Sequence, residues 1–202
     1  MRYLSIDLET SGSDPLTCQI IEFAAVLEDT HAPDVPVEEL PYLRLAVHYE
    51  IICGNVAALA MNARLLQELA DAEQKNNLPP DHCVAAEVLP RFAEFLDAQQ
   101  VNRKRALLTA GKNFASFDLP FIHNLPGYGE LLTISNAVID PALLYLDWQK
   151  DRKLPNMSTC KERASLSEIV SHQALDDARD VVRLLRPFYK RFVEPDQQGE
   201  AL

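Results

Sequence analysis

The chain has 202 residues, of which 48% are hydrophobic and 24% charged, values typical of one soluble globular domain with a full hydrophobic core. No apolar run approaches the roughly 20 residues that a membrane span needs, and Asp7 interrupts the N-terminal segment before a signal peptide could form. We therefore expect a cytoplasmic protein with no membrane partner, and the net charge of −11 argues against a tight clamp on a polyanion.

The charges are unevenly distributed along the chain. Residues 1–100 hold 5 basic and 17 acidic side chains, whereas residues 150–191 hold 10 basic and 6 acidic ones. The C-terminal third could therefore bind an anionic partner weakly and in a salt-sensitive way. The cysteines have no C-x-x-C spacing, which favours free thiols in a reducing compartment. They are Cys18, Cys53, Cys83 and Cys160.

The first half of the chain predicts strands followed by helices. Alternating or mostly apolar runs predict three strands, over 3–9, 20–27 and 42–48. Turn formers at 10–15 and prolines within 31–41 predict the loops between them. Residues 55–72 are expected to form one helix. After the break at Pro79-Pro80, Asp81 is expected to cap a second helix that runs to about Ala98.

The second half predicts a strand over 106–110 and a helix from Leu119, and Val138–Asp140 is expected to end a strand or begin a helix. The last helix is predicted to begin near Leu175, and Pro187 to kink or end it. We expect a single domain over 1–193 and a disordered tail over 194–202. Strands followed by interleaved helices imply an α/β fold with a mixed sheet.

Two carboxylates, Asp7 and Glu9, are separated by one residue on the first predicted strand, so they project from the same face. Like charges at this spacing repel, and a divalent cation gives a reason for the pair. The alternative is an exposed edge strand with solvated acids. Glu22, in the second strand, is interpreted as structural and paired with a base.

A third acid, Asp118, stands among apolar residues in the segment Asn113–Ile122. Such an acid is either a helix cap or a metal ligand. Near the end of the chain, His172 precedes the acidic pair Asp176-Asp177 at a predicted helix start. Alone, that pattern also fits a loop histidine followed by acids that favour the helix dipole.

Taken in order, these motifs resemble the DEDD superfamily of 3′→5′ exonucleases. The matching segments are Asp-x-Glu at Asp7, Asn-x-x-x-Phe-Asp ending at Asp118, and His-x-x-x-x-Asp from His172 to Asp177. A histidine five residues before the last acid is typical of the histidine (DEDDh) branch, whereas the other branch has a tyrosine four residues before it. The resemblance implies an RNase H-like mixed sheet flanked by helices, with Asp7 and Glu9 on a central strand.

The resemblance also implies the metal site and the general base. Asp7 would bridge two Mg²⁺ ions, Glu9 and Asp177 would complete the site of the attacking water, and Asp118 would hold the second ion. Mn²⁺ is expected to substitute for Mg²⁺. His172 would take the proton of the attacking water, because an ordinary histidine pKa of about 6.5 suits that role.

The implied activity is 3′→5′ exonucleolytic hydrolysis of single-stranded DNA or RNA, with nucleoside monophosphates as products. Many histidine-branch members have a His-Gly pair in the helical segment after the third strand, where this chain has the stretch Ala60-Met61-Asn62-Ala63, so Asn62 is expected to take part of the terminal-nucleotide contact. The expected substrate contacts are Leu8, Thr10, Ser11, Asn62 and Asn113. The alternatives are an endonuclease of the same fold and a non-catalytic nucleic-acid-binding module. A polymerase partner and a homodimer both stay open.

Overall fold

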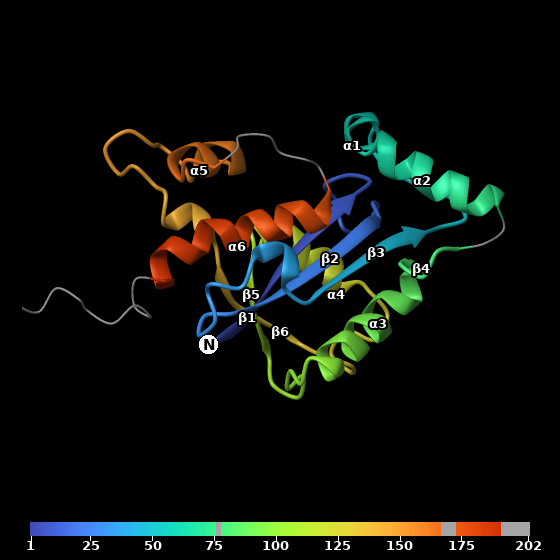
Figure 1. Cartoon of the computed structure of the whole chain (residues 1–202). Helices are drawn as coiled ribbons and strands as arrows, with labels where there is room; N and C mark the ends of the chain where they lie inside the picture. Colours follow the sequence, from blue (N-terminus) through green and yellow to red (C-terminus); the bar gives the residue numbers. More distant parts are fainter. Residues whose placement is uncertain (76–77, 167–172, 191–202) are drawn as a thin grey trace, which may run out of the picture.

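In the computed structural model, which describes residues 1–75, 78–166 and 173–190, a mixed sheet is covered by helices on both faces (Figure 1). The described residues form six strands in the order β4-β3-β2-β1-β5-β6. Neighbours pair antiparallel for β1–β2 and β2–β3 and parallel for β3–β4, β1–β5 and β5–β6. The strands are β1 Arg2–Thr10, β2 Ile20–Asp29, β3 Tyr42–His48, β4 His82–Val84, β5 Leu107–Ala110 and β6 Ile134–Ile139.

The two faces of β1 are buried against different helices. Leu4, Ile6 and Leu8 belong to the larger core, which includes Phe92 of α3 (Ala85–Ala98) and Ile122 of α4 (Asp118–His123). Tyr3 packs on the other side with Val181 and Leu185 of α6 (Ala174–Lys190). Figure 1 shows α6 and α3 on opposite sides of the sheet. The period-2 alternation of β1 thus directs its odd-numbered residues, including Asp7 and Glu9, toward α6.

The structure differs from the predicted helix over 55–72 by dividing it. Helix α1 covers Val56–Met61 and α2 covers Ala63–Gln74, and Asn62 lies between them as the C-cap of one and the N-cap of the other. Asparagine favours cap positions because its short amide competes with helical backbone bonds. Helix α2 packs on the sheet through Leu65 and Leu69, which contact Ile21 and Ala46.

Four further elements differ from the sequence-based expectation, namely β4, α3, α5 (Met157–Arg163) and α6. Strand β4 was missed, and α3 begins at Ala85 with Val84 as its N-cap, so the predicted cap at Asp81 is wrong. Helix α5 was also missed, because two of its residues, Cys160 and Lys161, are buried by tertiary contacts that its polar sequence does not indicate. Helix α6 continues through Pro187 to Lys190. Short 3-10 turns at Val37–Glu39 and Pro141–Leu143 complete the elements of the described chain.

No helix among the described residues is both long and apolar enough to span a bilayer. The predicted tail over 194–202 lies outside the described residues.

Candidate active site

Helix α6 brings a third carboxylate to the Asp7–Glu9 face of β1. Ser5 of β1 donates a hydrogen bond of 2.7 Å to the backbone carbonyl of Ala178, which fixes the helix directly over the strand. Ligand oxygens of Asp7, Glu9 and Asp177 all lie within 4.8 Å of one another. The three acids expected from motifs 170 residues apart therefore converge on one point above a central strand.

Asp118 joins this cluster from α4. It is the first residue of that helix, and the N-cap is Phe117, which makes no side-chain capping bond. The Asp118 carboxylate accepts a hydrogen bond of 3.2 Å from the backbone N–H of Leu8, between the two acids of β1. Asp118 is buried and its charge acts on Asp7. Asp118 is therefore not the N-cap of α4, and it lies beside the acids of β1.

The cluster is electrostatically costly without a counter-charge. Burial, followed by the charges of Asp118, Asp177 and Glu9, raises the pKa of Asp7 well above its ordinary value. Burial also raises the pKa of Glu9 to about 7, of Asp118 to about 8 and of Asp177 to about 7. Such increases are typical of carboxylates placed together for function, because folding alone does not reward mutual repulsion.

The donor set fits a divalent cation. Among the described residues, the buried Oδ1 of Asp177 has no hydrogen-bond partner, although it lies within the cluster. Several carboxylate oxygens within one small volume are the hard ligands that Mg²⁺ and Mn²⁺ prefer. The acidic cluster is thus compatible with divalent-metal binding.

A hollow of about 350 Å³ lies beside the acids, in the size class of small-ligand sites. Three expected substrate contacts, Leu8, Thr10 and Asn62, line it together with Glu9. The Asn62 amide nitrogen donates to the backbone carbonyls of Thr10 and Ala58, both at 3.3 Å, and the Asn62 side chain partly opposes the rise in the pKa of Glu9. The buried Oδ1 of Asn62 has no partner in the described part of the chain. Asn62 therefore keeps an acceptor beside the acids.

Met61 and Phe117 also line the hollow, and the sequence analysis missed both as contacts. Met61 is exposed despite being apolar, and Phe117 is only partly buried. Their positions directly before Asn62 and Asp118 were the only sequence indication available. Both provide apolar surface suited to a base or sugar.

Two expected contacts are not brought to this hollow. Ser11 is fully buried, and its hydroxyl donates to the carbonyl of Cys53 at 2.5 Å and accepts from the N–H of Gln19 at 2.8 Å. Its backbone N–H and C=O are also bonded within the protein, so the polar groups of Ser11 are all engaged internally and the structure does not bring Ser11 to this hollow. Asn113 is exposed with a positive φ of 59° and lies instead along a second groove, beside Lys112.

Glu22 is paired with a base, as its structural interpretation required. Arg44 donates to it at 2.6 Å, and Glu22 accepts a second bond of 2.8 Å from the N–H of Ala174, the first residue of α6. Glu22 thus fixes the start of the helix that carries Asp177. Arg44 also bonds Glu68 and Asp81, so its guanidinium already neutralises the acids that lie near His82.

His172, the expected general base, lies outside the described residues. The next described residue is Gln173, immediately before α6.

Comparisons with known proteins identify the fold of the chain but no relative by sequence. No protein-family model and no curated protein matches the chain. Among solved structures, it is similar to the crystal structure of cell-death related nuclease 4, with a TM-score of 0.60 and 14% identity. The match covers 94% of this chain and 64% of that chain. The predicted α/β fold, an RNase H-like mixed sheet flanked by helices, is therefore confirmed, and it is the fold of a solved nuclease.

Proposed function

We propose that the protein is a divalent-cation-dependent 3′→5′ exonuclease that hydrolyses phosphodiester bonds at the 3′ end of single-stranded DNA or RNA. The observation that carries the proposal is the convergence of Asp7, Glu9 and Asp177 within 4.8 Å, with Asp118 against the same strand. The likeness to a solved nuclease adds support for nucleic acid as the substrate, and the ordered motifs support the 3′→5′ direction.

Asp7, Glu9, Asp118 and Asp177 would hold the cations. Bound there, two divalent ions would activate a water and stabilise the charge on the phosphate and the leaving oxygen. Glu22 and Ser5 keep α6 in register with β1, so the carboxylates are held together before a substrate arrives.

The hollow beside Glu9 would take the terminal nucleotide. Leu8, Met61 and Phe117 offer apolar surface for its base or sugar, and Asn62 offers the unpartnered amide oxygen to a hydroxyl donor. His172 would accept the proton of the attacking water, a role supported by its spacing from Asp177.

Labelled strands test the direction of cleavage. With Mg²⁺, a 3′-labelled single strand should lose its label as mononucleotide in the first turnovers, and a 5′-labelled strand should give a descending ladder. Asp7→Ala is the matched negative control and should abolish both signals while the protein stays folded. Immediate release of a 5′-terminal mononucleotide would contradict the assigned direction.

Product analysis separates the alternatives. DNA, RNA and duplex substrates of the same sequence should be compared, because the proposal covers single-stranded DNA and RNA alike. Internal fragments from a strand blocked at both ends would indicate an endonuclease. Binding without any cleavage in Mg²⁺ or Mn²⁺ would indicate a non-catalytic module.

A further inference from the structure

A second groove, of about 890 Å³, is lined by residues of two segments that lead into helices α4 and α5. One wall is the segment after β5, with Lys112 and Asn113, and the other is the segment 150–157 that leads into α5. Phe117, in the same loop as Asn113, lines the hollow beside Glu9. One short segment, residues 112–117, therefore contributes to both this groove and the hollow proposed for the terminal nucleotide.

The groove is basic in a protein that is otherwise acidic. Four cations line it, Lys112, Lys150, Arg152 and Lys153. The one acid in the lining, Asp151, is neutralised by two hydrogen bonds from Arg163, at 2.5 and 2.9 Å. Such a local excess of positive charge attracts a polyanion even when the net charge of the protein is negative.

The cations of this groove are available to a ligand. Arg152 and Lys153 are exposed and have no hydrogen-bond or ion-pair partner within the described residues. Lys150 approaches Asp147 at 3.3 Å but is strongly exposed, and a pair of this kind is worth little. Trp148, two residues away from Lys150, is 83% exposed. Trp148 does not itself line the groove, but it stands two residues before Lys150, which does. An exposed aromatic side chain next to a cationic groove can stack a base of a strand whose phosphates are neutralised there.

Both walls of the groove are tied to the acidic cluster. Asp140 accepts a hydrogen bond of 3.0 Å from the backbone N–H of Asn113, which fixes the loop that leads to Asp118. On the other side, Lys161 of α5 forms a buried ion pair with Asp180, one turn after Asp177 in α6. The groove is therefore built onto the same two segments that supply Asp118 and Asp177.

We propose that this groove binds the phosphodiester backbone of the strand on the 5′ side of the bond that is cleaved, with Trp148 as a stacking surface for one of its bases. The inference rests on the proposed function, because it assigns the path of the uncleaved strand relative to the hollow. The groove neutralises phosphates without contacting base edges, so it accepts single strands irrespective of sequence.

The test removes the two unpartnered cations and measures binding without catalysis. Anisotropy of a labelled single strand of about 12 nucleotides is recorded with Ca²⁺ in place of Mg²⁺ for the parent and for Arg152→Ala/Lys153→Ala. Each phosphate contact to a single strand contributes about 0.7 to the slope of log K against log salt concentration, so the loss of two contacts should make that slope shallower by about 1.4. At about 0.1 M salt the dissociation constant then rises by roughly 25-fold.

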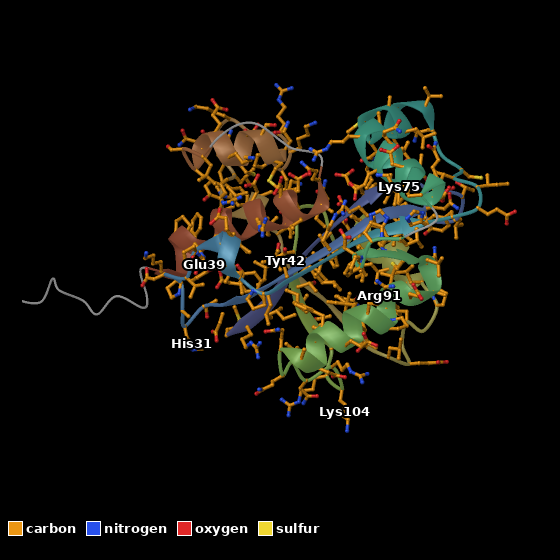
Figure 2. All side chains as sticks on the ribbon, turned by 45° about the vertical axis from the view of Figure 1, so that its right-hand side comes forward. His31, Glu39, Tyr42, Lys75, Arg91 and Lys104 are labelled. Atoms are coloured by element: carbon orange, nitrogen blue, oxygen red, sulfur yellow. The ribbon has the colours of Figure 1, made fainter. Side chains whose placement is uncertain are left out.

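A matched control is a distant basic pair, Lys104-Arg105, which is also exposed and precedes β5 rather than following it. Figure 2 shows Lys104 at the end of the molecule opposite to α5. Lys104→Ala/Arg105→Ala removes the same charge and should change affinity by less than about threefold. A control that loses as much affinity as the groove variant would show a general charge effect and overturn the proposal.

Two further measurements separate the groove from the proposed activity. Trp148→Ala should weaken binding by about fivefold or more with an unchanged salt dependence, because stacking releases no counterions. In Mg²⁺, Arg152→Ala/Lys153→Ala should lose several-fold more kcat/KM on the 12-nucleotide strand than on a dinucleotide. An equal loss of kcat/KM on both substrates, or an affinity of Arg152→Ala/Lys153→Ala equal to that of the parent, overturns the proposal that the groove binds the strand. A parent that cleaves neither substrate overturns the proposed function itself.

Discussion

Neutralising one acid of the cluster should stabilise the metal-free protein. The pKa of Asp177 rises from an ordinary 3.8 to about 7, mainly because the carboxyl is buried, with Asp180 adding repulsion. At about 1.4 kcal/mol per unit of pKa, this corresponds to roughly 4 kcal/mol above pH 7. Asp177→Asn removes the charge but still buries a polar amide, at a cost of about 1–2 kcal/mol. We therefore expect a net stabilisation of about 2–3 kcal/mol.

The pH dependence follows from the direction of the shift. Between about pH 4 and pH 7 the native state binds more protons at Asp177 than the unfolded state does, so the stability of the metal-free parent falls as pH rises through this window. Asp177→Asn removes that contribution. Below about pH 4 only the cost of burying the amide remains, so Asp177→Asn should be less stable than the parent by about 1–2 kcal/mol. The net stabilisation of about 2–3 kcal/mol should be complete only above about pH 7.

Thermal unfolding in EDTA at pH 5 and pH 8 measures the effect. For a chain of this size, 2–3 kcal/mol corresponds to an increase in Tm of about 5–10 °C at pH 8. The neighbouring Asp176→Asn is the control: Asp176 is about half exposed, so its stability should change by less than about 0.5 kcal/mol. With Mg²⁺ at 100 times its Kd, the free energy of unfolding of the parent should increase by about 2.7 kcal/mol, which brings the parent to about the stability of Asp177→Asn. A destabilised Asp177→Asn in EDTA at pH 8 would refute the argument.

Three further predictions concern the groups around the acids. Arg44→Met should destabilise the protein by about 3–5 kcal/mol, measured by urea unfolding, because it leaves the buried Glu22 without its counter-ion; an unchanged midpoint would contradict the positioning of α6 by this pair. Asn62→Ala should raise KM by about tenfold and lower kcat by less, since it removes one polar contact in the hollow. A fall in kcat alone would indicate that Asn62 takes part in the chemical step instead. His172→Ala should cost about 10²–10⁴ in single-turnover rate with metal affinity retained. Retention of more than about a third of the rate would exclude His172 as the base.

The sequence alone determined that the first two acids lie on the same face of the first strand. Period-2 alternation in Tyr3–Glu9 is sufficient to place Asp7 and Glu9 on one face of a strand and Ile6 and Leu8 on the other, whatever the rest of the chain does. The order of the acidic motifs likewise led to the RNase H-like fold, because the resemblance depends on spacing that is visible without coordinates.

The tertiary structure decided everything that depends on contacts between distant segments. Asn62 became an interhelical cap beside Glu9. Ser11 does not line the hollow, because its hydroxyl bonds the backbone of Cys53, 42 residues away, and that of Gln19. Helix α5 forms through the buried pair of Lys161 with Asp180, which no local pattern indicates. The basic groove exists for the same reason: only the packing of α5 on α6 brings Arg152 and Lys153 opposite Lys112. Side-chain burial is a property of the folded chain, so sequence periodicity cannot supply it.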